Sequence, residues 1–251
     1  MAALCIFFSR IYFESREMNA EFILHKILSI ADPEKAKFLQ GYFKTGQGQY
    51  AEGDIMLGLS VPIVRNIVKK SPDLSFSEIQ ILLDSKYHDV RFAGLLFLVR
   101  QFKRAKQEEK RGEIFNFYLK NTHRINNWDL VDTTCRDVIG LYLLDKENRS
   151  VLYKLAKSSN LWEQRIAIVS TWIFIKKQQF DDTLAISKKL MNHQHDLIHK
   201  AVGWMLREVG KNNYTILTDF LEKNYKRMPR TMLRCAIEHF SPEKKAHFMR
   251  K

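Results

Sequence analysis

The stretch Ile198-His199-Lys200-Ala201-Val202-Gly203-Trp204-Met205-Leu206-Arg207-Glu208-Val209-Gly210-Lys211 separates into two faces when it is wound as a helix. One face repeats apolar residues at the three- and four-residue spacing of a buried stripe. These residues are Ile198, Val202, Met205 and Val209. The opposite face gathers cations around a tryptophan, namely Lys200, Trp204, Arg207 and Lys211. The stretch therefore predicts an amphipathic helix that packs on one side and is polar on the other.

Helices of this kind recur along the chain from residue 76 onward. They align on Arg91, Asp129, Arg165, Lys200 and Arg234, which are spaced 38, 36, 35 and 34 residues apart. Two residues further on, the side chain is always small and apolar: Ala93, Val131, Ala167, Val202 and Ala236. Between these second helices lie candidate first helices at 76–84, 107–121, 147–157, 180–191 and 212–225. Strand patterns are scarce, so we expect an all-α fold, an α-solenoid of HEAT-like helix pairs curved with a basic concave face.

The chain before residue 76 predicts two more helices, at 19–31 and 33–44, divided by Asp32 and Pro33. The glycine-rich segment 45–60 follows them. A phosphate-binding loop would need a preceding strand and a following Lys-Ser/Thr pair, and neither is present, so an ordered connection is favoured. Residues 1–17 are a possible non-native or flexible extension if Met18 is the true start, and residues 18–251 are expected to form a single domain.

The composition points to an anionic partner. The formal net charge is +13, and essentially all of the excess lies after residue 75. Nucleic acid is the first candidate and an acidic membrane surface the second, whereas a basic surface that serves solubility alone is the alternative. Three widely spaced cysteines, Cys5, Cys135 and Cys235, indicate a reducing compartment such as the cytoplasm, without a thiolate metal site. No apolar run approaches the ~20 residues of a membrane span.

The segment Ile125–Arg136 concentrates polar residues at the start of a predicted helix. Its two asparagines are good helix caps. Trp128, Asp132 and Arg136 then follow one another at four-residue intervals along one row. In one interpretation Asp132 forms a surface ion pair with Arg136. In the other, Asp132 meets Arg165, because both lie in the early turns of consecutive second helices that a solenoid stacks side by side.

Other segments supply candidate binding residues. A tryptophan opposite the core and surrounded by cations is typical of a surface that faces phosphates, although a neighbouring repeat could equally cover Trp204. Arg230 and Arg234 extend the basic face toward the C-terminus, with a solvated charged face as the alternative. His195 and His199 have the spacing of a helical zinc pair, but they lack a third ligand. Solvated or capping histidines are therefore favoured, and we expect neither a metal nor a cofactor.

Together these motifs resemble the AlkD-like family of DNA alkylation repair proteins, the HEAT-like-repeat alkylpurine DNA glycosylases, over residues 36–250. The resemblance is carried by Tyr42-Phe43-Lys44-Thr45-Gly46 to Gly58, Asn126-Asn127-Trp128-Asp129-Leu130-Val131-Asp132, Trp162-Glu163-Gln164-Arg165, His199-Lys200-Ala201-Val202-Gly203-Trp204-Met205-Leu206-Arg207-Glu208 and Met228-Pro229-Arg230-Thr231-Met232-Leu233-Arg234.

The resemblance implies a monofunctional DNA glycosylase that removes cationic N3- or N7-alkylated purines, such as 3-methyladenine and 7-methylguanine, from double-stranded DNA. The residues that match the family's catalytic positions are Trp128, Asp132, Arg165 and Trp204. We expect DNA contacts from Tyr42, Lys200, Arg207, Lys211, Arg230 and Arg234. A monomer is expected. Because some relatives of this architecture bind DNA without excising bases, a catalytically silent protein that binds damaged or branched DNA is the alternative, and a helical adaptor for an acidic protein partner is a third hypothesis.

Overall fold

The computed structural model describes residues 19–250, and across these residues it confirms the all-α prediction. Apart from one isolated β-bridge between Ile55 and Tyr87, their regular structure is helical. No helix in this range is long and apolar enough to cross a membrane. The chain divides into two compact units, one ending at Gln101 and one beginning at Phe102. Cys5, the extension 1–17 and the start at Met18 lie outside the described residues, and the single domain stays a prediction.

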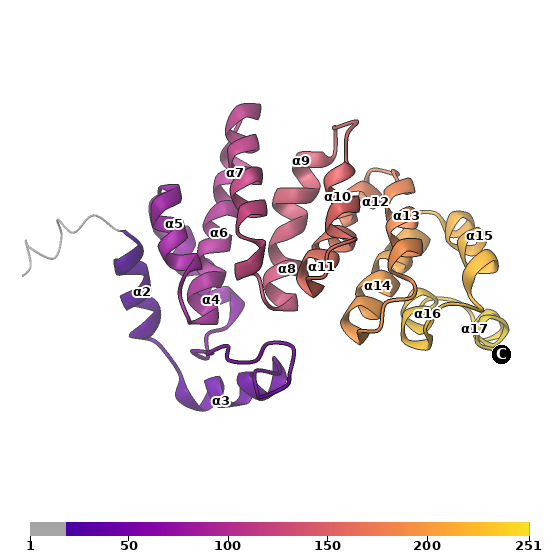
Figure 1. Cartoon of the computed structure of the whole chain (residues 1–251), viewed down its shortest axis with the longest axis horizontal. Helices are drawn as coiled ribbons and strands as arrows, with labels where there is room; N and C mark the ends of the chain where they lie inside the picture. Colours follow the sequence, from indigo (N-terminus) through magenta and orange to yellow (C-terminus); the bar gives the residue numbers. More distant parts are fainter. Residues whose placement is uncertain (1–18, 251) are drawn as a thin grey trace, which may run out of the picture. The chain divides into compact units, whose positions relative to one another are not determined.

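The helices of the first unit are α2 (Ala20–Leu28), α3 (Pro33–Tyr42), α4 (Val61–Lys70), α5 (Phe76–Leu83) and most of α6 (His88–Arg104) (Figure 1). The first two confirm the helices predicted at 19–31 and 33–44. Asn19 caps α2 and Asp32 caps α3, each side chain accepting a 3.0 Å hydrogen bond from an amide of the first turn. These caps satisfy donors that a helix leaves unpaired, which fixes where both helices begin.

Segment 45–60 is an ordered connection that buried charged side chains hold in place. Arg91 Nη2 donates to Asp54 Oδ1 at 2.6 Å, and His88 Nδ1 lies 3.0 Å from Asp54 Oδ2. Asp89 accepts hydrogen bonds from two loop amides at 2.7 and 3.0 Å. Because these contacts join the segment to the first turn of α6, they support the interpretation of 45–60 as a structural connection.

The second unit alternates the predicted first and second helices. First helices are α7 (Glu108–Lys120), α10 (Ser150–Leu155), α13 (Asp181–Leu190) and α15 (Tyr214–Asn224). Second helices are α8 (Trp128–Cys135), α11 (Leu161–Ser170), α14 (Asp196–Asn212) and α16 (Arg230–Ala236). The remaining helical elements are η1 (Thr122–Arg124), the π-helical η2 (Arg136–Gly140), α9 (Leu141–Leu143), α12 (Trp172–Lys176) and α17 (Pro242–Met249). The repeat register therefore predicted the first and second helices of this unit, and it did not predict the remaining helical elements.

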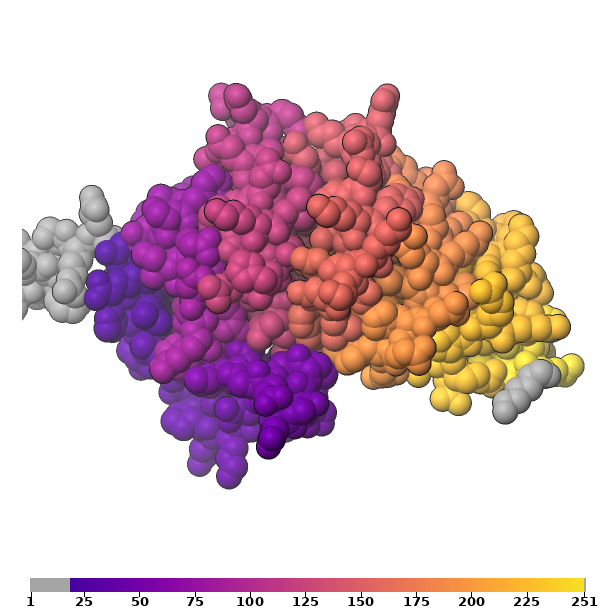
Figure 2. Space-filling model, in the orientation of Figure 1, coloured from indigo at the N-terminus to yellow at the C-terminus, as the bar shows by residue number. Residues whose placement is uncertain are grey.

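Consecutive second helices pack against each other in chain order. α8 contacts α11, α11 contacts α14, and α14 contacts α16 (Figure 1). The small apolar column is buried at these contacts, with Val131, Ala167, Val202 and Ala236 at most 1% exposed. Side chains fill the spaces between the ribbons of these helices (Figure 2). The packing supports a repeat array, whereas the curved solenoid with a basic concave face stays a prediction.

A glycine controls the closest approach between α14 and α16. A Cβ atom added to Gly203 would lie 2.5 Å from both the Cβ of Cys235 and the carbonyl oxygen of Met232. Real Cβ atoms do not approach backbone this closely, so the two helices can meet at this distance only because residue 203 lacks a side chain.

Candidate active site

The centre of the candidate site is a two-point ion pair between α8 and α11. Arg165 Nε donates to Asp132 Oδ1 at 2.8 Å, and Arg165 Nη2 donates to Asp132 Oδ2 at 2.7 Å. The pair is largely buried, with the Asp132 side chain 16% exposed and the Arg165 side chain 7% exposed. The structure thus favours the interpretation in which Asp132 meets Arg165 across adjacent repeats, rather than a surface pair with Arg136.

Arg165 is itself held from a third helix. Its Nη1 donates to the carbonyl oxygen of Leu197 at 2.6 Å, in the first turn of α14. That turn is capped by His195, whose Nδ1 accepts from the amide of Leu197 at 3.1 Å. His195 therefore has the capping role, one of the two roles that the sequence favoured. Three consecutive second helices together fix the orientation of the Asp132 carboxylate.

The electrostatics of Asp132 are a balance between burial and two arginines. Burial raises the pKa of the Asp132 carboxyl above its ordinary value, and the charge and hydrogen bonds of Arg165 oppose this rise. Arg136 opposes it more weakly. At neutral pH an ionised Asp132 is a concentrated negative charge in a largely dehydrated setting, which strengthens its interaction with any cation placed nearby.

Trp128 lies one turn before Asp132 on the same helix and is half-buried. It is the first residue of α8, and the side chain of the capping Asn127 accepts from its amide at 2.8 Å. This cap was predicted, and it determines where the helix starts and therefore which residue stands one turn from the carboxylate.

Trp204 is half-buried on α14, and the sequence did not anticipate the cation beside it. The guanidinium carbon of Arg136 lies 6.0 Å from the Trp204 ring centroid and 4.8 Å from the Trp172 ring centroid. Arg136 thus joins Asp132's own helix to α12 and α14. The sequence spacing could have predicted that Trp172 lies near the site. Trp172 comes seven residues after Arg165 and so falls on the same helical face.

The three cations expected around Trp204 have acidic partners. Lys200 pairs with Asp196 at 2.7 Å, and Lys211 pairs with Glu208 at 2.8 Å. Arg207 pairs with Glu238, which lies just after the end of α16. Glu208 is only 6% exposed. Burial tends to raise its pKa, but Lys211 and Lys176 outweigh this effect and hold the pKa below its ordinary value. These cations form a mixed, ion-paired surface.

The other residues predicted to contact DNA are Arg230, Arg234 and Tyr42. Arg230 and Arg234 are exposed on α16, and Arg230 Nη2 donates to the carbonyl oxygen of Met249 at 2.8 Å. Tyr42 belongs to the first unit, where the residue is 55% exposed and its ring packs edge-on against Phe43 with centroids 5.1 Å apart.

The nearby thiol is unsuited to nucleophilic chemistry. Cys135 is fully buried on α8, and burial raises the pKa of its thiol to about 12. A protonated, inaccessible thiol does not attack a substrate. Asp132 is therefore the better candidate for a reacting group on this helix.

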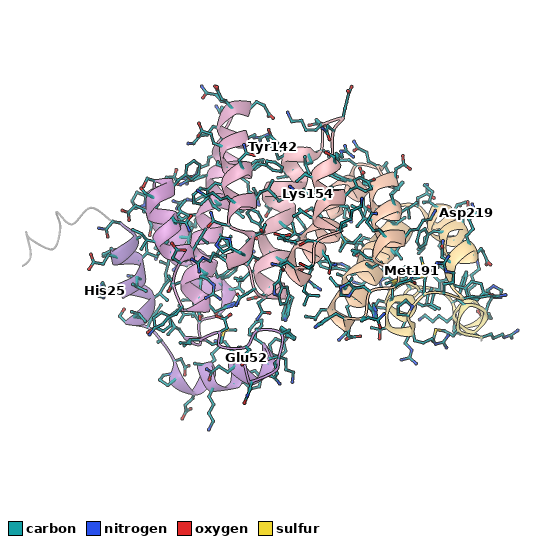
Figure 3. The ribbon with its side chains drawn as sticks, in the orientation of Figure 1. His25, Glu52, Tyr142, Lys154, Met191 and Asp219 are labelled. Carbon is teal, nitrogen blue, oxygen red and sulfur yellow. The ribbon has the colours of Figure 1, made fainter. Side chains whose placement is uncertain are left out.

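Two surface depressions of the second unit lie apart from the candidate site. One, of about 680 Å³, is formed by α13 and α15 and lined by residues such as Phe180 and Asp219, the latter labelled in Figure 3. The other, of about 530 Å³, is lined by residues that include Tyr153. No lining residue of either depression belongs to the predicted catalytic set.

Comparisons with known proteins agree with these features. A family model described as "DNA alkylation repair enzyme" matches residues 23–240. Among solved structures, one titled "Predicted DNA alkylation repair enzyme from Enterococcus faecalis" has a similar fold, with a TM-score of 0.65 and 16% sequence identity. The match covers 84% of this chain and 97% of that chain. A search of curated proteins found no match.

Proposed function

The chain belongs to the DNA alkylation repair enzyme family, and from this premise we propose that it is a DNA glycosylase for cationic N3- and N7-alkylpurines, such as 3-methyladenine and 7-methylguanine. The observation that carries the proposal is the geometry of Asp132. Arg165 orients its carboxylate through 2.8 and 2.7 Å hydrogen bonds, while 16% of the Asp132 side chain stays exposed. A fixed, partly accessible carboxylate is suited to stabilise a developing positive charge.

The chemistry of the substrate explains why so few groups suffice. Alkylation at N3 or N7 places a positive charge on the purine, so the base departs as a neutral molecule when the glycosidic bond breaks. No strong general acid is needed. The sugar, however, acquires oxocarbenium character at C1′, and this cation must be stabilised and then captured by water, as in glycoside hydrolysis.

Asp132 would serve both steps. Its negative charge stabilises the sugar cation, and a carboxylate oxygen accepts a hydrogen bond from the attacking water. The C1′–N bond breaks with its electron pair going to the base, the water oxygen bonds to C1′, and the released proton passes to the carboxylate and then to solvent. The hydrogen bonds from Arg165 keep the carboxylate in one orientation throughout.

Trp128 and Trp204 would border the deoxyribose. Both residues are half-buried, so neither side chain is fully enclosed by the protein. Contact with the sugar and backbone would displace water and so strengthen the interaction between Asp132 and the cationic sugar. We further propose that the lesion reacts without entering a deep base pocket, unlike the substrates of most base-modifying enzymes.

The decisive experiment is release of free base from a duplex with one 7-methylguanine, measured in single turnover with the purified protein. A matched duplex with guanine is the control. The proposal expects release from the methylated duplex well above the spontaneous rate and none from the control. DNA binding without release above the spontaneous rate would instead identify a catalytically silent DNA-binding protein.

A further inference from the structure

Arg136 is a cation of the candidate site that the proposed chemistry leaves without a role. Among residues 19–250 its side chain contacts the rings of Trp172 and Trp204, and its guanidinium meets no hydrogen-bond acceptor or carboxylate. The side chain is partly exposed. A guanidinium carries five N–H donors in one plane, so donors of Arg136 are open to a ligand.

The neighbouring acidic side chains are already committed. Both oxygens of Asp132 accept from Arg165, and Asp137 pairs with Lys103 at 2.8 Å. Arg165 differs from Arg136, because each of its three side-chain nitrogens already donates a hydrogen bond, two to Asp132 and one to a backbone carbonyl. Within the described part of the site, Arg136 is thus the arginine equipped to receive an anion from outside.

The backbone explains how Arg136 reaches the aromatic rings. It begins η2, the π-helical continuation of α8, which packs on α11 and α12. A Cβ atom added to Gly140, at the end of η2, would lie 2.5 Å from the carbonyl oxygen of Ser170. This close approach brings η2 next to Trp172, the first residue of α12. π-helical turns inside α-helices occur frequently at functional sites.

Stacking on an aromatic ring holds a guanidinium in one plane while its edge stays free for hydrogen bonding. A phosphodiester presents two oxygens that match such an edge. The position also has an electrostatic advantage, since Arg136 lies one helical turn after Asp132. A phosphate bound there is separated from the Asp132 carboxylate by a positive charge, which reduces the repulsion between the two anions.

We propose that Arg136 binds a DNA backbone phosphate at or next to the damaged nucleotide, with Trp172 fixing the plane of its guanidinium. The inference rests on the proposed glycosylase function and adds the contact that sets the damaged sugar against Asp132. Arg165 and Arg136 thereby have separate tasks: Arg165 orients the carboxylate, and Arg136 holds the DNA.

The test uses duplexes that carry a tetrahydrofuran abasic-site analogue and, in each duplex, one uncharged methylphosphonate at a different phosphate around it. Affinities are compared for the wild type, Arg136→Gln and Arg136→Lys. The control variant is Lys154→Gln. It removes one exposed charge on α10, the first helix of its helix pair (Figure 3). Thermal melting establishes that each variant is folded.

We expect one methylphosphonate next to the analogue to weaken wild-type binding about tenfold, the effect of losing a hydrogen bond between charged groups. Arg136→Gln should bind the unmodified duplex about tenfold more weakly than the wild type does. Its affinity should no longer fall when the methylphosphonate replaces that one phosphate, and the effects at the other phosphates should be unchanged. Arg136→Lys should keep part of the sensitivity, because a lysine retains the charge without the planar pair of donors. Lys154→Gln should behave as the wild type.

If Arg136→Gln and Arg136→Lys are as sensitive as the wild type at every phosphate, the proposal is wrong. Base release from a 7-methylguanine duplex separates this failure from that of the proposed function. Release by the wild type together with unchanged phosphate sensitivity in the variants rejects the role of Arg136 alone. Absence of release together with the expected loss of sensitivity rejects the glycosylase and leaves the phosphate contact standing.

Discussion

Asp132 on α8 and Arg165 on α11 are joined by two hydrogen bonds of 2.8 and 2.7 Å, so the orientation of the carboxylate is set by a different repeat from the one that carries it. A third helix fixes the arginine in turn through the Leu197 carbonyl. A small shift of any of these helices would therefore move the charge that the proposed reaction depends on.

Arg165→Lys tests this dependence. A lysine keeps the positive charge but cannot donate two parallel hydrogen bonds to one carboxylate, so Asp132 loses its fixed orientation. We expect release of 7-methylguanine to fall about 100-fold, the scale on which a misplaced catalytic group costs activity. DNA affinity should stay within a few-fold of the wild type. A variant that keeps full activity would show that the orientation of Asp132 is unimportant.

Arg165→Met makes the stabilising role of the pair measurable. Removal of one partner leaves Asp132 buried without its counter-charge, a change that typically costs about 3–5 kcal/mol. Chemical denaturation should therefore show a clear loss in the free energy of unfolding. The Asp132→Asn/Arg165→Met double variant should recover part of this loss, because it buries no unpaired carboxylate. Equal stability of the single variant and the wild type would contradict a strong pair.

The pH dependence of base release reports on Asp132. Its pKa is raised from the ordinary value of 3.8, because burial outweighs the opposing effect of Arg165. The ionised carboxylate is the active form, so activity should be constant near neutral pH and should fall as the pH drops through this raised pKa. The midpoint is expected above 3.8, and single-turnover rates across an acidic pH series measure it. A rate that rises on acidification would contradict the role of the carboxylate.

The packing between second helices can be tested at Gly203. Gly203→Ala would place a Cβ atom 2.5 Å from the backbone of α16 and should destabilise the protein by about 1–3 kcal/mol. Gly41→Ala, in α3, is the matched control, since a Cβ atom there would have no neighbour within 4 Å. The control should be neutral or stabilising, because alanine favours helix more than glycine does. Equal melting temperatures for both variants would contradict the close approach.

Much of this architecture could be predicted from local patterns in the sequence. The cap at Asn127 and the spacing of the apolar stripes fix where helices begin and which faces they bury. The repeat register then places Asp132 and Arg165 in early turns of adjacent helices, which made their pairing one of two predicted alternatives, and the structure decides between them. These features depend on periodicity and capping, both of which are local properties of the chain.

The contacts of Arg136 could not be predicted in this way. They depend on the π-helical turn of η2, which changes the helical register directly after Cys135, and on the packing of α12 against η2 and α14. The ion pair of Arg207 with Glu238 was missed for a related reason, whereas the pair of Lys211 with Glu208, three residues apart on one helix, could have been predicted from the spacing. A helical wheel shows which side chains share a face, but it does not show which acidic groups, such as Glu238, a neighbouring helix brings to that face.

The central claim, that the Asp132 carboxylate performs the reaction, is tested most directly by Asp132→Asn. The substitution removes the negative charge while an amide oxygen can still accept a hydrogen bond from Arg165. Single-turnover release of 7-methylguanine and affinity for the abasic-analogue duplex are measured on the same preparation. We predict that release falls at least 100-fold, the scale of a lost electrostatic stabiliser, while DNA affinity is kept or improved. Release at the wild-type rate by folded Asp132→Asn protein would contradict the account.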